Sequence, residues 1–160
     1  MNLVHLHLLL NHLPVVGSFV AVLLFAGALY KRAISMRFAL WFAVALGAVA
    51  LGVYFTGEPA EETVEKIVGI TERSIERHEE AADLATIVIG SLSGLALLAL
   101  LLFRRREIPR WVAAAGLAGM ILSSVVMGWT ANLGGQIRHS EILGVTAPTA
   151  ERAGERESEQ

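Results

Sequence analysis

Four long apolar blocks alternate with short polar segments along the 160-residue chain. They run over residues 8–30, 38–55, 84–103 and 111–133. Each holds about 18–23 residues, the length with which a helix crosses ~30 Å of hydrocarbon. None shows the alternation of apolar and polar residues that a transmembrane β-strand requires. We therefore predict an all-α integral membrane protein whose residues 1–145 form a four-helix bundle of two antiparallel hairpins.

Basic residues are unevenly divided between the two ends of this predicted bundle. The loops within the two hairpins hold seven basic residues and one acid, namely Lys31, Arg32, Arg37, Arg104, Arg105, Arg106, Arg110 and Glu107. Short loops rich in lysine and arginine stay in the cytoplasm. We therefore expect the N-terminus, the 57–77 loop and the C-terminal tail to be extracytoplasmic.

The polar segment between the second and third blocks carries helix signals. Pro59 stands in what reads as the first turn of a short helix, and Gly69 is expected to end it. A second helix is expected to begin near Thr71 and to continue into the third span. The sequence therefore predicts a short helical extracytoplasmic loop, whereas the polar residues 146–160 read as a disordered tail.

Composition agrees with a membrane location and narrows the chemistry. The chain is 54% hydrophobic, above the roughly 45–50% of soluble domains. Its net charge of −2 offers no basic surface for nucleic acid, so the expected partner is the lipid bilayer. The sequence contains no cysteine, which excludes disulfides, thiolate metal sites, iron–sulfur clusters and haem attached through cysteine.

The candidate chemistry lies in the histidines, all of which the topology places at the outer membrane face. They are His5, His7, His12, His78 and His139. Neutral imidazole is a good ligand for zinc, copper and haem iron. We therefore expect a cofactor or metal site at this face, the alternative being that the histidines are interfacial anchors.

Helical geometry separates the histidines of the first span. His5 and His12 are seven residues apart and share a face, while His7 shares a different face with Asn11. His7 and His12 lie about 140° apart around a regular helix, so they cannot both bind one ion. Pro14 breaks the helical hydrogen bonding, and a kink there would bring the two closer.

Small residues form a stripe on the fourth span. Gly128, Asn132, Gly135 and His139 recur at intervals of four, three and four. Such a stripe lets a flat macrocycle or another backbone approach closely. The alternative is small-residue helix packing, for which the span offers Gly116, Gly119, Ser123, Ser124 and Gly128.

Acidic residues near the same face have two interpretations. Asp83 is expected to pair with Arg138 or to support a ligand histidine as a hydrogen-bond acceptor. Glu62 and Glu79 offer carboxylate oxygens that would complete a metal site with the histidines. The alternative is a solvated acidic surface.

The two hairpins show a faint internal repeat. Each opens with a histidine, His12 or His78, and turns at a basic loop. Each closes with an aromatic residue followed by threonine, at Thr56 and Thr130. Two parallel hairpins related by an axis along the membrane normal would explain this pattern.

At these residues the chain resembles the bacterial four-helix membrane protein family of domain of unknown function 2231. The opening of that family, a pair of histidines followed by proline, is similar to His7, His12 and Pro14. Further likenesses are Thr56-Gly57 after the second helix, His78 before the third, and Gly134-Gly135 followed by His139 after the fourth. Leu8, Asn11 and Leu13 depart from the family's pattern, and the gap before His139 is shorter. The resemblance covers roughly residues 7–140 and implies a bacterial plasma membrane protein that binds b-type haem through these histidines.

The leading hypothesis is therefore a membrane haem b protein that carries electrons near the outer face. Its axial ligands would be drawn from His7, His12, His78 and His139, with His12 preferred as the partner of His78 or His139. His7 would then be a partner of a haem propionate or a ligand to a second site. Asn11, Asn132 and Gly135 would line the cofactor.

Two further hypotheses stay open. One is a copper or zinc module in which the same four histidines bind the ion together with Glu62 or Glu79. The other is a structural subunit of a larger membrane complex. The sequence shows no catalytic motif, so we expect an electron-transfer or binding protein with a redox partner or a larger complex rather than an enzyme.

Overall fold

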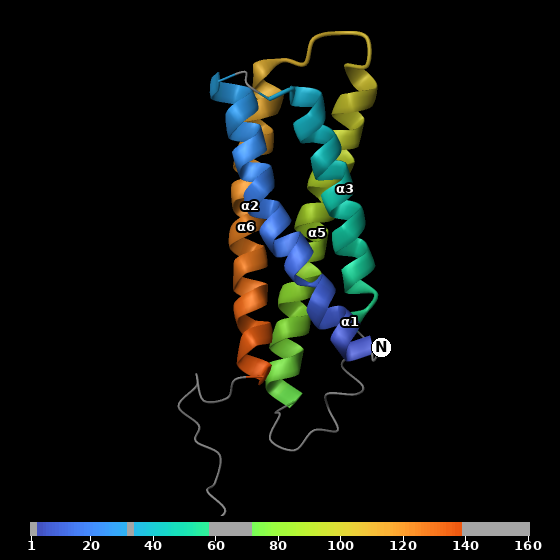
Figure 1. Ribbon diagram of the computed structural model, residues 1–160, viewed down its shortest axis with the longest axis vertical. Coiled ribbons are helices and arrows are strands. Elements are labelled where there is room, and N and C mark those ends of the chain that lie inside the picture. Colours follow the sequence, from blue (N-terminus) through green and yellow to red (C-terminus); the bar gives the residue numbers. More distant parts are fainter. Residues whose placement is uncertain (1–2, 32–33, 58–71, 139–160) are drawn as a thin grey trace, which may run out of the picture.

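The computed structural model describes residues 3–31, 34–57 and 72–138, and within these ranges it is helical and contains no strand (Figure 1). The elements in chain order are α1 (Leu3–Leu10), α2 (His12–Ala26), the π-helical turn η1 (Gly27–Lys31), α3 (Met36–Tyr54), α5 (Glu72–Leu102) and α6 (Arg110–Arg138). The predicted short helix before Gly69 and the predicted tail 146–160 lie outside the described residues.

The helices form a four-membered bundle in which each packs on two others. Helix α2 packs against α3 and α6, and α5 packs against the same two helices. Figure 1 shows α1, the end of α3, the start of α5 and the end of α6 at one end of the bundle. The segments that join α2 to α3 and α5 to α6 lie at the opposite end. This arrangement confirms the predicted all-α four-helix bundle.

Four helical stretches are long and apolar enough to cross a membrane. They are His7–Tyr30, Met36–Tyr54, Glu72–Leu102 and Arg110–Ile137. The third begins close to the predicted start at Thr71 and runs without a break into the apolar span. The helices therefore extend past the apolar blocks at the end that holds the histidines.

The first span is interrupted near its proline. Helix α1 ends at Leu10 and α2 begins at His12, with Asn11 in a turn between them. Pro14 has no N–H to donate to the carbonyl of Leu10, so the regular hydrogen-bond ladder fails at this point. The resulting α1–α2 segment runs obliquely across the bundle (Figure 1).

Small residues let the helices approach closely in the core. Ala21, Ala39 and Ala43 are fully buried. A Cβ atom added at Gly47 would collide with Ser93, and one added at Gly116 would collide with Phe25. The core therefore depends on short side chains facing larger ones across the helix interfaces.

The small residues of α6 divide into two groups. Ser123 and Ser124 are buried, and a Cβ at Gly119 would collide with Leu92, as helix packing predicts. Gly128 and Gly135 have no atom within 4 Å of an added Cβ. The packing interpretation thus holds for the first half of the helix, and in the second half the positions of Gly128 and Gly135 face open space.

Large apolar side chains cover the outside of the bundle. Leu23 is 69% exposed, Ile87 65% and Val125 65%. Apolar area in water costs about 25 cal/mol per Å², so this surface is unfavourable in solution and favourable against lipid tails. Together with the four spans, it identifies an integral membrane protein.

Candidate functional site

His7 is held through one ring nitrogen by a threonine from the second helix of its own hairpin. Its Nδ1 lies 2.9 Å from the hydroxyl oxygen of Thr56. That hydroxyl donates its only hydrogen to the carbonyl of Val53, at 2.6 Å. The oxygen must therefore accept from Nδ1–H of His7, and in the neutral imidazole Nε2 carries the lone pair.

His78 is fixed in the same tautomer by a backbone carbonyl. Its Nδ1 lies 3.1 Å from the carbonyl oxygen of Thr130. A carbonyl only accepts hydrogen bonds, so Nδ1 of His78 carries the hydrogen and Nε2 is again the basic nitrogen. The hydroxyl of Thr130 lies 3.0 Å from both the Ala81 and the Val126 carbonyl, which ties α6 to α5 beside the imidazole.

The two imidazoles lie near each other at the same end of the bundle. They are close enough to interact electrostatically, and both are partly buried. Glycines lie against each ring, since an added Cβ would lie 3.6 Å from Cε1 of His7 at Gly57 and 2.9 Å from Cε1 of His78 at Gly134. The structure thus brings one histidine from each hairpin to the same end of the bundle.

The paired contacts follow the internal repeat of the chain. In each hairpin, a histidine of the first helix donates to a threonine at the end of the second, as His7 does to Thr56 and His78 to Thr130. The two threonines are those that the repeat predicted. The histidine equivalent to His78 is His7, whereas the repeat had placed His12 in that position.

The remaining candidate histidines lie elsewhere. His12 is exposed, and its Nδ1 lies 2.9 Å from the carbonyl of Leu8, one turn earlier. His5 is also exposed. The kink at Pro14 therefore leaves His7 and His12 with different partners, and the structure groups His78 with His7 rather than with His12. His139 lies outside the described residues.

The predicted lining residues have different surroundings. Asn11 precedes α2 and makes no side-chain hydrogen bond that caps the helix. Asn132 is exposed, and Gly135 has no neighbour within 4 Å of an added Cβ. The glycine that contacts His78 is Gly134, the residue before Gly135.

Of the candidate acidic residues, Asp83 and Glu79 lie in the part of the chain that the structure describes, and neither is hydrogen-bonded to His7 or His78. Asp83 accepts a hydrogen bond of 2.7 Å from the hydroxyl of Tyr54, a partner that the sequence did not indicate. Glu79 is exposed, and Glu62 lies outside the described residues. Over the described ranges, no group of three or more His, Asp or Glu side chains is arranged to hold a metal ion.

Sequence reasoning missed the positioning roles of Thr56 and Gly134. Both residues belong to motifs that carried the family resemblance, Thr56-Gly57 and Gly134-Gly135. Neither motif indicates which histidine it contacts. That pairing depends on how the helices cross. The one sequence feature that indicated this pairing was the threonine at the end of each hairpin.

The fold and site define a class, an integral membrane four-helix bundle with two histidines oriented through Nδ1 at one end. No family model, no curated protein and no solved structure matches the sequence. The resemblance to the four-helix family therefore stays a prediction.

Proposed function

We propose that this protein binds haem b through Nε2 of His7 and Nε2 of His78 and carries electrons at one face of the membrane. The observation that carries the proposal is the hydrogen bond at Nδ1 of each ring, from which the tautomer is inferred. Each Nδ1–H is engaged by a fixed acceptor, Thr56 or Thr130. Histidines that bind metals are oriented in this way, with the second ring nitrogen donating to a carbonyl or a polar side chain.

The number of ligands favours haem over a bare ion. Haem brings four ring nitrogens of its own, so two imidazoles complete its iron coordination. Zinc requires three or four protein ligands, and the described residues offer no group of three at this site. A pair of histidines therefore suits haem iron better than zinc.

The chemistry of the donors and the surrounding surface fit a flat macrocycle. Both basic nitrogens are neutral imidazole nitrogens, and the chain has no thiolate to compete for the iron. Gly134 and Gly57 lie beside the rings, while Gly128 and Gly135 leave the surface of α6 without side-chain bulk. When bound, the haem supplies reversible one-electron chemistry at its iron.

The position of the site along the bundle suits exchange with a partner outside the bilayer. His7 stands at the first residue of the first membrane-spanning stretch, and His78 lies six residues after the start of the third. By the distribution of arginine and lysine, this end faces away from the cytoplasm. We propose that the electron partner approaches from that side.

Haem content of histidine variants tests the proposal. The full chain is expressed with added haem precursor, purified in mild detergent and assayed for haem per protein. We expect His7→Ala and His78→Ala each to lose most of the haem. His12→Ala is the matched control, because His12 is exposed and bonded only within its own helical segment, and it should keep wild-type haem content.

Metal analysis of the same samples separates the alternatives. If the wild type holds a stoichiometric copper ion and no haem, and the ion is lost in His7→Ala and His78→Ala, the site is assigned to copper instead of haem. An inert, cofactor-free protein that co-purifies with other membrane proteins would favour the structural-subunit alternative. Haem retained in all three variants would also contradict the proposed ligands.

A further inference from the structure

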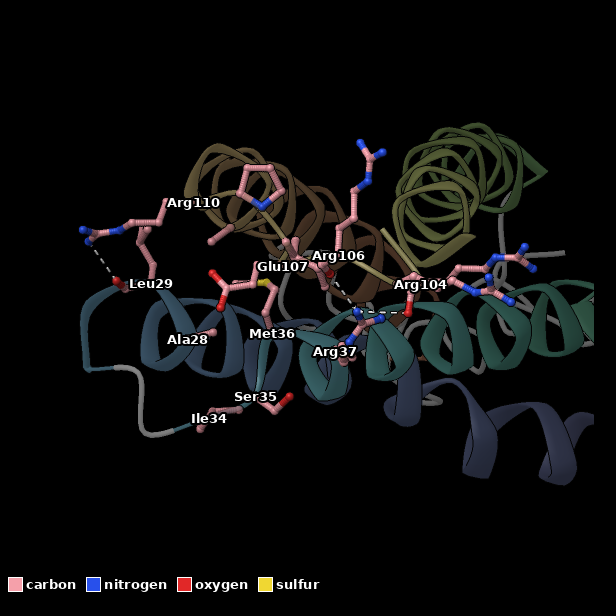
Figure 2. Close-up of a pocket in the computed structure, with 14 residues that line it drawn as sticks. Ala28, Leu29, Ile34, Ser35, Met36, Arg37, Arg104, Arg106, Glu107 and Arg110 are labelled. Atoms are coloured by element: carbon pink, nitrogen blue, oxygen red, sulfur yellow. Dashed lines mark hydrogen bonds between the residues drawn. The ribbon is translucent and has the colours of Figure 1, made fainter. Parts of the chain in front are cut away.

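The end of the bundle opposite the histidines contains a pocket of about 830 Å³ (Figure 2). It lies between η1, the start of α3 and the segment that connects α5 to α6. Its charged lining residues are Arg37, Arg104, Arg105, Arg106, Arg110 and Glu107. Five positive charges against one negative charge make this end strongly basic.

Two of these arginines cover the carbonyl groups at helix ends. Arg37 donates to the carbonyls of Phe103 at 2.7 Å and Arg106 at 2.9 Å, after the last turn of α5. Arg110 donates to the carbonyl of Leu29 in η1 at 3.2 Å. Figure 2 shows the bonds of Arg37 to the Arg106 carbonyl and of Arg110 to the Leu29 carbonyl. Because these acceptors are engaged, the partial negative charge of the helix C-termini is screened at this end.

Two helix N-termini add partial positive charge to the same pocket. Ser35 precedes α3 and makes no side-chain hydrogen bond to cap it. Helix α6 begins at Arg110, directly after Pro109. Ser35, Pro109 and Arg110 all line the pocket. Backbone N–H groups at helix N-termini favour anions, above all those with phosphate oxygens.

The three consecutive arginines at the pocket rim are exposed. We call Arg104, Arg105 and Arg106 the arginine cluster. Figure 2 shows the side chains of Arg104 and Arg106 pointing away from the pocket, while the carboxylate of Glu107 turns into it. The cluster therefore reaches groups around the bundle rather than a ligand enclosed in the pocket.

Tryptophans mark the depth of this end in the membrane. Trp41 and Trp111 lie in the first two turns of α3 and α6 and are 56% and 66% exposed. Exposed tryptophan is enriched where the hydrocarbon meets the headgroups. The arginine cluster follows α5 and precedes Trp111 in the polar connection, so its guanidinium groups stand at the level of lipid phosphates.

We propose that the arginine cluster and the adjoining helix N-termini bind the phosphates of anionic phospholipid headgroups. Guanidinium groups recognise phosphate oxygens with paired hydrogen bonds. A basic surface between membrane helices is suited to lipids such as phosphatidylglycerol or cardiolipin. Glu107 opposes this binding by its charge, because its carboxylate repels an anionic headgroup and would attract one that also carries an amine.

Lipid binding to the full-length protein in dodecyl maltoside tests the proposal. The protein is titrated with phosphatidylglycerol or phosphatidylcholine of the same acyl chains, and retained lipid is counted by native mass spectrometry. Each arginine near a charged headgroup contributes about fivefold in affinity. We therefore expect at least tenfold preference for phosphatidylglycerol, and a roughly 20-fold loss of that affinity in the double variant Arg104→Gln/Arg105→Gln.

A matched control removes the same charge from the other end. Arg73→Gln/Arg77→Gln changes two exposed arginines of α5 near the histidines, and its affinity should stay within twofold of wild type. Equal retention of the two lipids by the wild type would overturn the proposal. An equal loss in both double variants would do the same, because it would show an effect of overall charge.

Two further measurements test the proposal even if the cluster variant fails to fold. Glu107→Gln should raise the affinity for phosphatidylglycerol several-fold, and an unchanged or lower affinity would contradict an anionic headgroup. Inorganic phosphate at millimolar concentration should leave the lipid bound. Displacement of the lipid by that phosphate would assign the site to free phosphate instead.

Discussion

Thr56 uses its single hydroxyl hydrogen on the Val53 carbonyl, and its oxygen is thereby left to accept from His7. Thr130 orients His78 differently, through its backbone carbonyl. Any residue at this position would offer the same acceptor. The two imidazoles are therefore held in the same tautomer, one by a side chain and the other by the main chain. This difference makes the two threonines unequal in mutagenesis.

Thr56→Val should weaken haem binding by roughly 10- to 100-fold, the usual cost of removing a partner of a ligand histidine. The variant removes the hydroxyl that accepts from Nδ1–H of His7 and leaves the Val53 carbonyl as the remaining acceptor beside the ring, so the orientation of the imidazole is less firmly fixed. Haem titration of the apoprotein measures the change. Thr56→Ser retains the hydroxyl and should bind like the wild type.

Thr130→Val is the matched control for that prediction. It keeps the carbonyl that accepts from His78 and loses only the hydroxyl contacts with Ala81 and Val126. We expect a stability loss of about 0.6 kcal/mol, typical of a hydrogen bond between membrane helices, with haem affinity within a few-fold of wild type. A loss of haem as large as in Thr56→Val would contradict the tautomer argument.

Gly134→Ala should displace the imidazole of His78. The new Cβ would lie 2.9 Å from Cε1 of that ring, so the ring must shift and the haem content should fall. Gly94→Ala, in the middle of α5, meets no atom within 4 Å and should leave the haem content unchanged. Absorbance of the purified variants per mole of protein measures both, and equal haem in the two would contradict the close contact.

At the scale of the helices, the apolar blocks of the sequence predict the four spans well. Block length and the absence of alternation suffice for this, because backbone hydrogen bonding in lipid allows few structures. The start of α5 at Glu72 also follows from the sequence. The length of a block does not define where a helix ends in water, so the extension of α6 to Arg138, beyond the block that ends at residue 133, appears only in the structure.

The choice between His7 and His12 was not predictable from periodicity. One helix of regular geometry gives the angle between two side chains but not the direction in which the helix crosses its neighbours. The break at Asn11 and the oblique path of α1 bring His7 to Thr56, 49 residues away in sequence, and leave His12 exposed (Figure 1). Contacts of this range come from packing, which the pattern of a single segment does not contain.

Gly47→Ala tests the close approach of α3 to α5. The added methyl group would collide with Ser93, and overpacking of this kind costs about 1–3 kcal/mol. We expect a lower thermal unfolding midpoint in detergent. Gly90→Ala, where an added Cβ meets nothing within 4 Å, is the control and should be neutral. A Ser93→Gly change should restore part of the stability lost in Gly47→Ala, and the absence of rescue would contradict this contact.

At the scale of the whole molecule, the fold places the histidines and the arginines at opposite ends of the bundle. The histidine pair lies at the end of the bundle that holds α1 and the end of α6, and the arginines lie at the other end (Figures 1 and 2). The sequence predicts this separation because four crossings alternate the loops between two sides. Which end faces the cytoplasm rests on the distribution of arginine and lysine.

Reporter fusions measure that orientation directly. We expect a reporter that is active only outside the cytoplasm to be active when fused after residue 145 and inactive when inserted at residues 104–106. The positive charges of the hairpin loops are the physical reason. The reverse pattern would place the histidine pair at the cytoplasmic face and contradict the proposed side of electron exchange.

Electron paramagnetic resonance of the oxidised, haem-loaded protein tests the central claim most directly. If Nε2 of His7 and Nε2 of His78 both bind the iron, the ferric haem is low-spin, and either single alanine variant converts the signal to high-spin or removes it. A protein that binds no haem, or a wild-type signal that is high-spin and unchanged in His7→Ala and His78→Ala, would contradict the claim.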